Sequence, residues 1–179
     1  MTVVHVQDKR FETYIGSVEI NKRVAALAAQ LNTDYVGLNP LLLGILNGSF
    51  IFAADLFRNI TVPAEISFIK LASYKGTTST GNVITAIGLE ENIAGRHVII
   101  VEDIIDTGRT LHSFLPQVML QQPASLKIAC FLSKPDAREY QVDADYIGFE
   151  IPNNFVVGYG LDYDGQGRNL PDLYTLCTD

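Results

Sequence analysis

Three short apolar runs constrain the fold of this chain most strongly. They are Leu41–Leu46, residues 97–101 and residues 126–132. A strand with one solvated face alternates apolar and polar residues, whereas a continuous apolar run is typical of a strand buried on both faces. A segment with helical spacing precedes the first run, and its apolar side chains recur on one face at Ile20, Val24, Leu27, Ala28 and Leu31. Buried strands alternating with helices predict an α/β fold, with a mainly parallel sheet flanked by helices.

The same patterns predict the other elements. Ser17 is the expected cap of the first helix, and further helices are expected over residues 50–57 and 110–121. Additional strands are expected over residues 64–70, 83–89, 145–150 and 155–157. Residues 73–82 contain two glycines and four consecutive hydroxyl residues, which predicts an exposed loop.

The length of 179 residues suits one domain with one core. We therefore expect a single domain over residues 1–179. Its core is expected over about 15–135. A smaller hood over the site is expected from about 1–14 and 136–179.

Composition narrows the classes of partner. The formal net charge is −7 with 13 lysines and arginines and no basic cluster, so nucleic-acid binding, which depends on neutralising phosphates, is not expected. No apolar run approaches the roughly 18 residues of a membrane span, and the first residues lack a secretory signal pattern. We expect a cytoplasmic protein without membrane contact. Cys130 and Cys177 form no metal-binding or redox motif, which favours reduced thiols.

The segment after the second apolar run indicates a binding site. The run ends in Glu102 and Asp103, and adjacent acids there are costly unless a metal ion or sugar hydroxyls pair with them. Asp106, Thr107, Gly108, Arg109 and Thr110 then lead into a predicted helix. Small residues and a helix N-terminus present backbone N–H groups to an anion. Because ligands of parallel sheets bind at the carboxyl ends of the strands, residues 102–111 are expected to bind a sugar phosphate.

This segment also carries a family resemblance. Residues 101–111, with Glu-Asp-Ile-Ile-Asp-Thr-Gly at 102–108, resemble the phosphoribosyl-diphosphate-binding signature of type I phosphoribosyltransferases, in the form of the hypoxanthine-guanine branch. The resemblance extends over nearly the whole chain. It implies purine salvage, in which the phosphoribosyl group of phosphoribosyl diphosphate is transferred to hypoxanthine and/or guanine. The products are IMP or GMP and diphosphate, Mg²⁺ is the implied cofactor, and a homodimer or homotetramer is the implied assembly.

The resemblance also implies residue roles. Asp106 matches the general base that faces N7 of the purine. The implied phosphoribosyl and 5′-phosphate contacts are Glu102, Asp103, Asp106, Thr107, Gly108, Arg109 and Thr110. The implied diphosphate contacts are Leu46, Asn47, Gly48, Ser73, Tyr74 and Arg168. The implied purine contacts are Lys134, Phe155, Val156 and Asp162, and the implied metal contacts are Glu102, Asp103 and Asp162.

Three of these positions have further implications. The Leu46–Asn47 peptide matches one that is often cis in the family, although Asn47 stands where many relatives have lysine or arginine. Ser73 and Tyr74 open a loop that closes over the site in the family. Lys134 matches a lysine that donates to O6 of the purine, which favours 6-oxopurines over adenine because adenine offers donors at that position.

Two alternatives remain at this point. A phosphoribosyltransferase for xanthine or a pyrimidine is one, and Asp106 together with Lys134 argues against it. A non-catalytic regulator that senses phosphoribosyl diphosphate is the other, and Asp106 and the charge of −7 argue against that. A dinucleotide-binding dehydrogenase is excluded by the lack of a Gly-x-Gly-x-x-Gly motif. The sequence leaves the choice among hypoxanthine, guanine and xanthine open.

Overall fold

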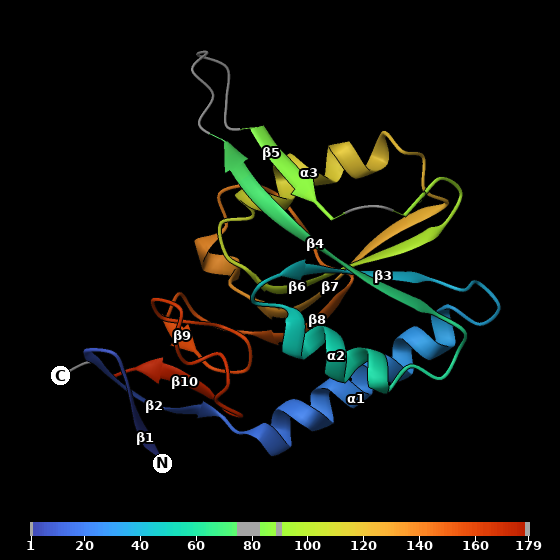
Figure 1. Cartoon of the computed structure of the whole chain (residues 1–179). Helices are drawn as coiled ribbons and strands as arrows, with labels where there is room; N and C mark the ends of the chain where they lie inside the picture. The colour runs from blue at the N-terminus through green and yellow to red at the C-terminus, as the bar shows by residue number, and fades with distance from the viewer. Residues whose placement is uncertain (1, 75–82, 89–90, 178–179) are drawn as a thin grey trace.

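A computed structural model describes residues 2–74, 83–88 and 91–177, and its centre is a six-stranded sheet with helices on both faces (Figure 1). The strand order is β5-β4-β3-β6-β7-β8. The pairs β4–β3, β3–β6, β6–β7 and β7–β8 are parallel, and only β5 joins antiparallel, at one edge. The strands are β3 (Leu41–Leu46), β4 (Glu65–Tyr74), β5 (Val83–Ile87), β6 (His97–Ile105), β7 (Ser125–Ser133) and β8 (Tyr146–Glu150). The predicted α/β class with a mainly parallel sheet is confirmed.

The apolar runs supply both faces of this sheet. Leu42 packs with buried residues of α1 (Ser17–Asp34) and α2 (Phe50–Arg58). Its neighbours Leu41 and Leu43 pack on the opposite face with α3 (Arg109–Met119). All three leucines are at most 1% exposed. Continuous apolar strands are therefore required here, because successive side chains face opposite sides of the sheet and each side is covered by helices.

The end of β6 differs from the prediction that the strand stops before the acids. β6 continues to Ile105 and pairs with β7 through Glu102↔Cys130 and Ile105↔Ser133. The neighbouring strand is equally long, so ladder hydrogen bonds keep this backbone extended past the apolar run. Glu102 and Asp103 consequently lie in a strand, and the loop begins only at Asp106.

A second, antiparallel sheet lies beside the first (Figure 1). Its order is β1-β2-β10-β9, with β1 (Val3–Val6), β2 (Lys9–Ile15), β9 (Val156–Val157) and β10 (Leu173–Leu176). Its small core contains the buried side chains Val6, Phe11, Val157 and Tyr174. Strands β1, β2 and β10 have no counterpart among the predicted elements. These three strands lie within the residue ranges expected for the hood. β8 also lies within those ranges but belongs to the larger sheet. The division into core and hood stays a prediction.

The predicted capping of α1 by Ser17 is wrong. The helix begins at Ser17, the N-cap position is Gly16, and no side-chain cap hydrogen bond is formed there. The Ser17 N–H instead donates to Asp172 Oδ1 at 2.6 Å. Asp172 immediately precedes β10, so a carboxylate from the C-terminal part of the chain occupies the positive end of the first helix. That contact spans 155 residues of sequence, which is why a local pattern did not reveal it.

Asp172→Asn is expected to destabilise the fold by about 0.5–1 kcal/mol, the lower part of the range for a lost helix cap because the carboxylate is partly solvated. The hydrogen bond from the Ser17 backbone lowers the pKa of Asp172 below its ordinary value of 3.8. A carboxyl whose folded pKa is lowered stabilises the protein above the unfolded value and loses that contribution as pH falls through the folded value. Urea unfolding at pH 7 and at successively lower pH should therefore show a difference that shrinks below about pH 4. The matched control is Asp143→Asn at an exposed site, and an equal effect at both positions would contradict the capping role.

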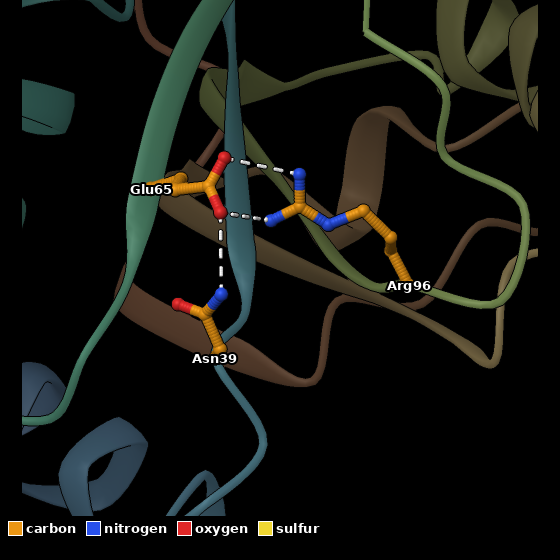
Figure 2. Close-up of polar contacts among 3 residues, drawn as sticks. All are labelled: Asn39, Glu65 and Arg96. Atoms are coloured by element: carbon orange, nitrogen blue, oxygen red, sulfur yellow. Dashed lines mark hydrogen bonds and ion pairs between the residues drawn. The ribbon is translucent and has the colours of Figure 1, made fainter.

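Polar contacts join the strands at the opposite, N-terminal edge of the sheet (Figure 2). Arg96, just before β6, donates from Nη1 and Nη2 to the Glu65 carboxylate at 3.1 and 2.8 Å. Asn39, just before β3, donates to Glu65 Oε1 at 3.2 Å. The hydrogen bonds from Arg96 lower the pKa of Glu65. One carboxylate at the start of β4 thus links the beginnings of three adjacent strands, while the carboxyl ends point to the site described next. No helix among the described residues has the length and apolar character needed to cross a membrane.

Candidate active site

The carboxyl ends of β3, β6 and β7 bring the predicted residues together. Leu46 ends β3 and residues 47–49 follow it, residues 106–110 follow β6, and Lys134 follows β7. These three strands are neighbours in the parallel sheet, so their outgoing loops meet at one edge. Two pockets lie there.

The first pocket has a volume of about 260 Å³ and follows the turn from β6 into α3. Gly108 is the N-cap of α3 with φ of +80°, and no side chain caps this helix end. The N–H groups of a helix's first turn have no partner within the helix and attract anions. All five residues predicted for the phosphate cup line this pocket, together with Glu102: Asp106, Thr107, Gly108, Arg109 and Thr110.

The second pocket has a volume of about 250 Å³ and adjoins the first, since Ile104 and Asp106 line both. It contains every residue predicted to contact the purine: Lys134, Phe155, Val156 and Asp162. Lys134 is 6% exposed, and its Nζ lies 3.6 Å from Asp106 Oδ2. Phe155, at 45% exposed, offers a large apolar side chain to this pocket. A flat apolar ring, a buried ammonium and a carboxylate thus face one cavity.

Glu102 and Asp103 form an acidic pair at the back of the site. Burial, followed by the charge of Asp103, raises the pKa of Glu102 well above its ordinary value. Burial also raises the pKa of Asp103, although several hydrogen bonds and the charge of Arg168 oppose the shift. The Asp103 Oδ1 atom accepts the Ile104 N–H at 2.9 Å. Burial and mutual repulsion thus disfavour the charged forms of these two carboxyls, and a cation or sugar hydroxyls would stabilise those forms.

A divalent cation fits this pair chemically. Glu102 Oε2 is buried and lacks a hydrogen-bond partner in the described part of the chain. Mg²⁺ prefers oxygen ligands and commonly takes one or two carboxylates together with substrate phosphates. Within residues 2–74, 83–88 and 91–177, no group of three or more candidate ligands is assembled. The third predicted contact, Asp162, is engaged by Arg168 Nη2 at 2.6 Å and by the Gly165 N–H at 2.7 Å.

The loop after β3 packs directly on the acidic pair. A Cβ atom added to Gly48 would lie 1.5 Å from Asp103 Oδ2, so only glycine fits there. The Leu46–Asn47 peptide is cis, and Asn47 is exposed. Gly160 covers the loop from the other side, because its added Cβ would lie 2.2 Å from the Gly48 carbonyl oxygen. Arg168 Nη1 donates to the Gly160 carbonyl at 2.7 Å, which places this predicted diphosphate contact beside the loop.

Two predicted diphosphate contacts, Ser73 and Tyr74, lie in a strand and not in the expected loop. Ser73 and Tyr74 end β4 and pair with Ile84 and Val83 of β5. Residues 75–82 of the predicted closing loop lie outside the described residues.

Comparison with known proteins decides the family. Residues 16–164 match the family model described as "Phosphoribosyl transferase domain". The chain belongs to this family. The match includes the acidic pair, the loops that line the two pockets and Lys134, and it ends just after Asp162.

Relatives and solved structures agree with this assignment. A protein of Streptococcus pneumoniae named hypoxanthine-guanine phosphoribosyltransferase is 47% identical over 159 residues, which covers 88% of either chain. A hypoxanthine-guanine-xanthine phosphoribosyltransferase of Tritrichomonas foetus is 38% identical over 98% of this chain and 97% of that one. The crystal structure of a hypoxanthine-guanine phosphoribosyltransferase from Bacillus anthracis superposes with a TM-score of 0.86 at 38% identity, covering 93% of this chain and 98% of that chain.

Some lining residues had no individual role in the sequence predictions. Ile104 lines both pockets, and Leu161 lines the second. Each directly follows or precedes a predicted acid, Asp103 or Asp162, so proximity in sequence was the available signal. Gly160 gave no comparable signal, because its contact with Gly48 spans most of the chain.

Proposed function

We propose that this protein transfers the phosphoribosyl group of phosphoribosyl diphosphate to hypoxanthine and/or guanine, yielding IMP or GMP and diphosphate. The observation that supports this most is that the phosphate-type pocket and the base-type pocket meet at Asp106. A ribose 5-phosphate in the first pocket would direct its C1 carbon toward the second. Relatives that match most of this chain bear the names of such enzymes.

The 5′-phosphate accepts hydrogen bonds from the N–H groups and hydroxyls of residues 106–110 in the first pocket. Glu102 and Asp103 hold the ribose hydroxyls, directly or through a metal ion. Leu46, Asn47 and Gly48 supply backbone groups to the diphosphate, and Arg168 supplies a positive charge. In this arrangement binding energy from the phosphates places C1 next to the base.

The reaction then exchanges one bond for another at C1. The bond from C1 to the diphosphate oxygen breaks, and a purine ring nitrogen forms the new bond. Positive charge develops on the ribose as diphosphate leaves, and the acidic pair stabilises it. Asp106 accepts the proton that the purine loses. Mg²⁺ held by Glu102, Asp103 and the substrate phosphates would neutralise the departing diphosphate.

Purine selection is assigned to the second pocket. Phe155 stacks on the ring, and the Val156 backbone bonds the base edge. The Lys134 ammonium donates to O6, and because a 6-amino group offers no acceptor at that position, adenine is rejected.

Lys134→Ala is expected to raise KM for hypoxanthine by about 10-fold to 100-fold, the usual loss for a hydrogen bond to a buried charge. The dissociation constant for phosphoribosyl diphosphate should change by less than about 3-fold, because the proposed contacts to its 5′-phosphate lie in the first pocket. Steady-state kinetics with calorimetry separates the two quantities. Losses of equal size for base and sugar donor would contradict the role of Lys134 as the O6 donor.

An assay with four different purine bases tests the proposed function. The protein is mixed with Mg²⁺, phosphoribosyl diphosphate and, separately, hypoxanthine, guanine, xanthine or adenine, and nucleotide formation is followed by absorbance. Product with hypoxanthine or guanine and none with adenine is expected. Product with xanthine alone, or with a pyrimidine in a parallel reaction, would replace the proposal by a different base specificity.

We also propose that residues 1–179 act as one domain, with a core of about 15–135 and a hood of about 1–14 and 136–179, in a cytoplasmic homodimer or homotetramer. The family to which the chain belongs supports the assembly. Light scattering on eluted protein that gave only a 19.7 kDa species would contradict it.

A further inference from the structure

A short segment behind the phosphate pocket contacts the turn that forms the pocket. It comprises Arg138, Glu139 and Tyr140, which follow the 3-10 helix η1 (Pro135–Ala137), and we name it the brace. The Glu139 and Tyr140 N–H groups both donate to the Thr107 carbonyl, each at 3.0 Å. The packing is equally close at the next residue, since a Cβ added to Gly108 would lie 2.7 Å from the Tyr140 carbonyl oxygen.

These two hydrogen bonds fix the orientation of one peptide plane. The Thr107 carbonyl and the Gly108 N–H belong to the same peptide, which is trans. In a trans peptide the C=O and N–H point in opposite directions. Two donors that hold the Thr107 carbonyl toward the brace therefore turn the Gly108 N–H the other way, toward the pocket that Thr107 and Gly108 line. Among the described residues, the Gly108 N–H has no hydrogen-bond acceptor.

Side chains of the brace also contact the first turn of α3. Glu139 Oε2 lies 3.0 Å from Arg109 Nη2, and the Arg109 Cζ atom lies 5.7 Å from the centre of the Tyr140 ring. The His112 ring stacks obliquely on Tyr140 with 4.9 Å between centroids. Arg109 and Glu139 are more than half exposed, so their ion pair contributes little stability and the backbone contacts matter more. Arg109 is nevertheless held against the brace.

The brace is connected to the base pocket as well. The Ala137 N–H donates to the Lys134 carbonyl at 3.2 Å, and the Lys134 N–H donates to the Ile105 carbonyl at 2.9 Å. Arg138 Nη2 donates to Ser133 Oγ at 2.9 Å. Hydrogen bonds therefore link the brace, directly and through η1, to the end of β7 and to Lys134, and at its other end to the phosphate turn.

We propose that Glu139 and Tyr140 are positioning residues for the 5′-phosphate: their backbone N–H groups orient the Thr107–Gly108 peptide so that the Gly108 N–H donates to the phosphate of the sugar donor. This inference rests on the proposed function for the identity of the ligand. Preorganised N–H groups bind an anion without reordering the loop, which is the source of their advantage.

Two substitutions at one position isolate the backbone donor. Glu139→Ala removes the ion pair with Arg109 but keeps the N–H, whereas Glu139→Pro removes both. The preceding residue, Arg138, has φ of −68° and ψ of 120°, an extended conformation that a following proline favours. We expect KM for phosphoribosyl diphosphate to change by less than about 3-fold in Glu139→Ala. In Glu139→Pro it should rise by about 10-fold, because the Thr107–Gly108 peptide loses one of the two bonds that orient it and the Gly108 N–H no longer aligns with the charged phosphate.

Two further measurements separate positioning from general damage. KM for hypoxanthine should stay within about 2-fold of the parent in both variants, which a misfolded site would not allow. Tyr140→Ala, which keeps the N–H but removes the ring against Arg109 and His112, should raise KM for phosphoribosyl diphosphate by about 3-fold, as for one aromatic contact. Equal kinetics in Glu139→Pro and Glu139→Ala, or matching rises in both substrate constants, would contradict the inference. If the proline variant did not fold, a rise of about 10-fold in Glu139→Ala or Tyr140→Ala, which both keep the backbone N–H, would contradict the inference, because the side chain and not the N–H would then carry the effect.

Binding of ribose 5-phosphate, measured by calorimetry, tests the brace without requiring catalysis. Affinity in Glu139→Pro should fall about 10-fold relative to Glu139→Ala. If the parent protein binds ribose 5-phosphate but forms no nucleotide, the proposed function fails while this comparison still decides the role of the brace.

Discussion

Asp106→Asn is expected to lower kcat with hypoxanthine by about 10²-fold or more, the range for loss of a general base. Asparagine has nearly the same shape but does not accept a proton at neutral pH. The contacts proposed for the 5′-phosphate are the N–H groups and hydroxyls of residues 106–110, which this substitution keeps, so the variant should bind phosphoribosyl diphosphate within about 3-fold of the parent. Rapid-mixing kinetics, in which a single turnover is followed, measures the chemical step separately from product release.

The control for Asp106 is an acid near the site but outside both pockets. Asp136→Asn, in η1 and exposed, changes the same functional group two residues after Lys134. Its turnover should match that of the parent. A single-turnover rate in Asp106→Asn equal to that of Asp136→Asn would show that another group accepts the purine proton.

Gly48→Ala is expected to reduce kcat/KM by about 10²-fold or more. The added methyl group would lie 1.5 Å from Asp103 Oδ2 and 2.4 Å from its Cγ, so either the acid or the loop after β3 must move. A displacement of roughly 1 Å at a reacting centre is enough for a loss of this size. Because Gly48 and Asp103 are assigned to the diphosphate and the ribose, KM for the sugar donor should rise more than KM for the base.

Gly16→Ala is a matched control. A Cβ added to Gly16 meets no atom within 4 Å, and its φ of −76° is ordinary for alanine. Both variants remove one glycine, but only Gly48→Ala creates a clash in the site. Parent-like kinetics in Gly48→Ala would mean that the position of Asp103 next to this loop is not required. A fall of the melting temperature shared by both variants would instead locate the effect in stability.

The larger sheet was predictable because its strands are buried on both faces. Runs such as Leu41–Leu46 place apolar side chains against two helix layers, so consecutive residues are apolar and the run can be recognised in the sequence. Of the smaller sheet, only β9 (Val156–Val157) was predicted, within the strand expected over residues 155–157. β2 has only Phe11 and Ile15 buried, with polar residues between them, so it lacks a continuous apolar run. The stability of this sheet comes from pairing of β2 with β10, residues that lie at opposite ends of the chain.

The candidate site shows the same division between local and long-range information. Most of the residues that line the two pockets were predicted from the order of acids, threonines and glycine in residues 102–110 and from the family resemblance. The residues that position them were missed. Glu139 and Tyr140 contact the turn from some 30 positions away, as the separation of Arg109 and Glu139 shows. The Asp172 contact with Ser17, like that of Gly160 with Gly48, likewise becomes visible only when the chain is folded.

The most direct test of the central claim is the stoichiometry of products. Purified protein is incubated with Mg²⁺, phosphoribosyl diphosphate and hypoxanthine, and IMP and diphosphate are quantified by chromatography against the Asp106→Asn variant. The account predicts equal amounts of IMP and diphosphate from the parent, with the initial rate reduced about 10²-fold or more in the variant. Diphosphate without IMP would mean that water, and not a purine, attacks C1. Neither product, from protein that binds phosphoribosyl diphosphate, would contradict the enzymatic account and favour a regulator that senses this sugar phosphate.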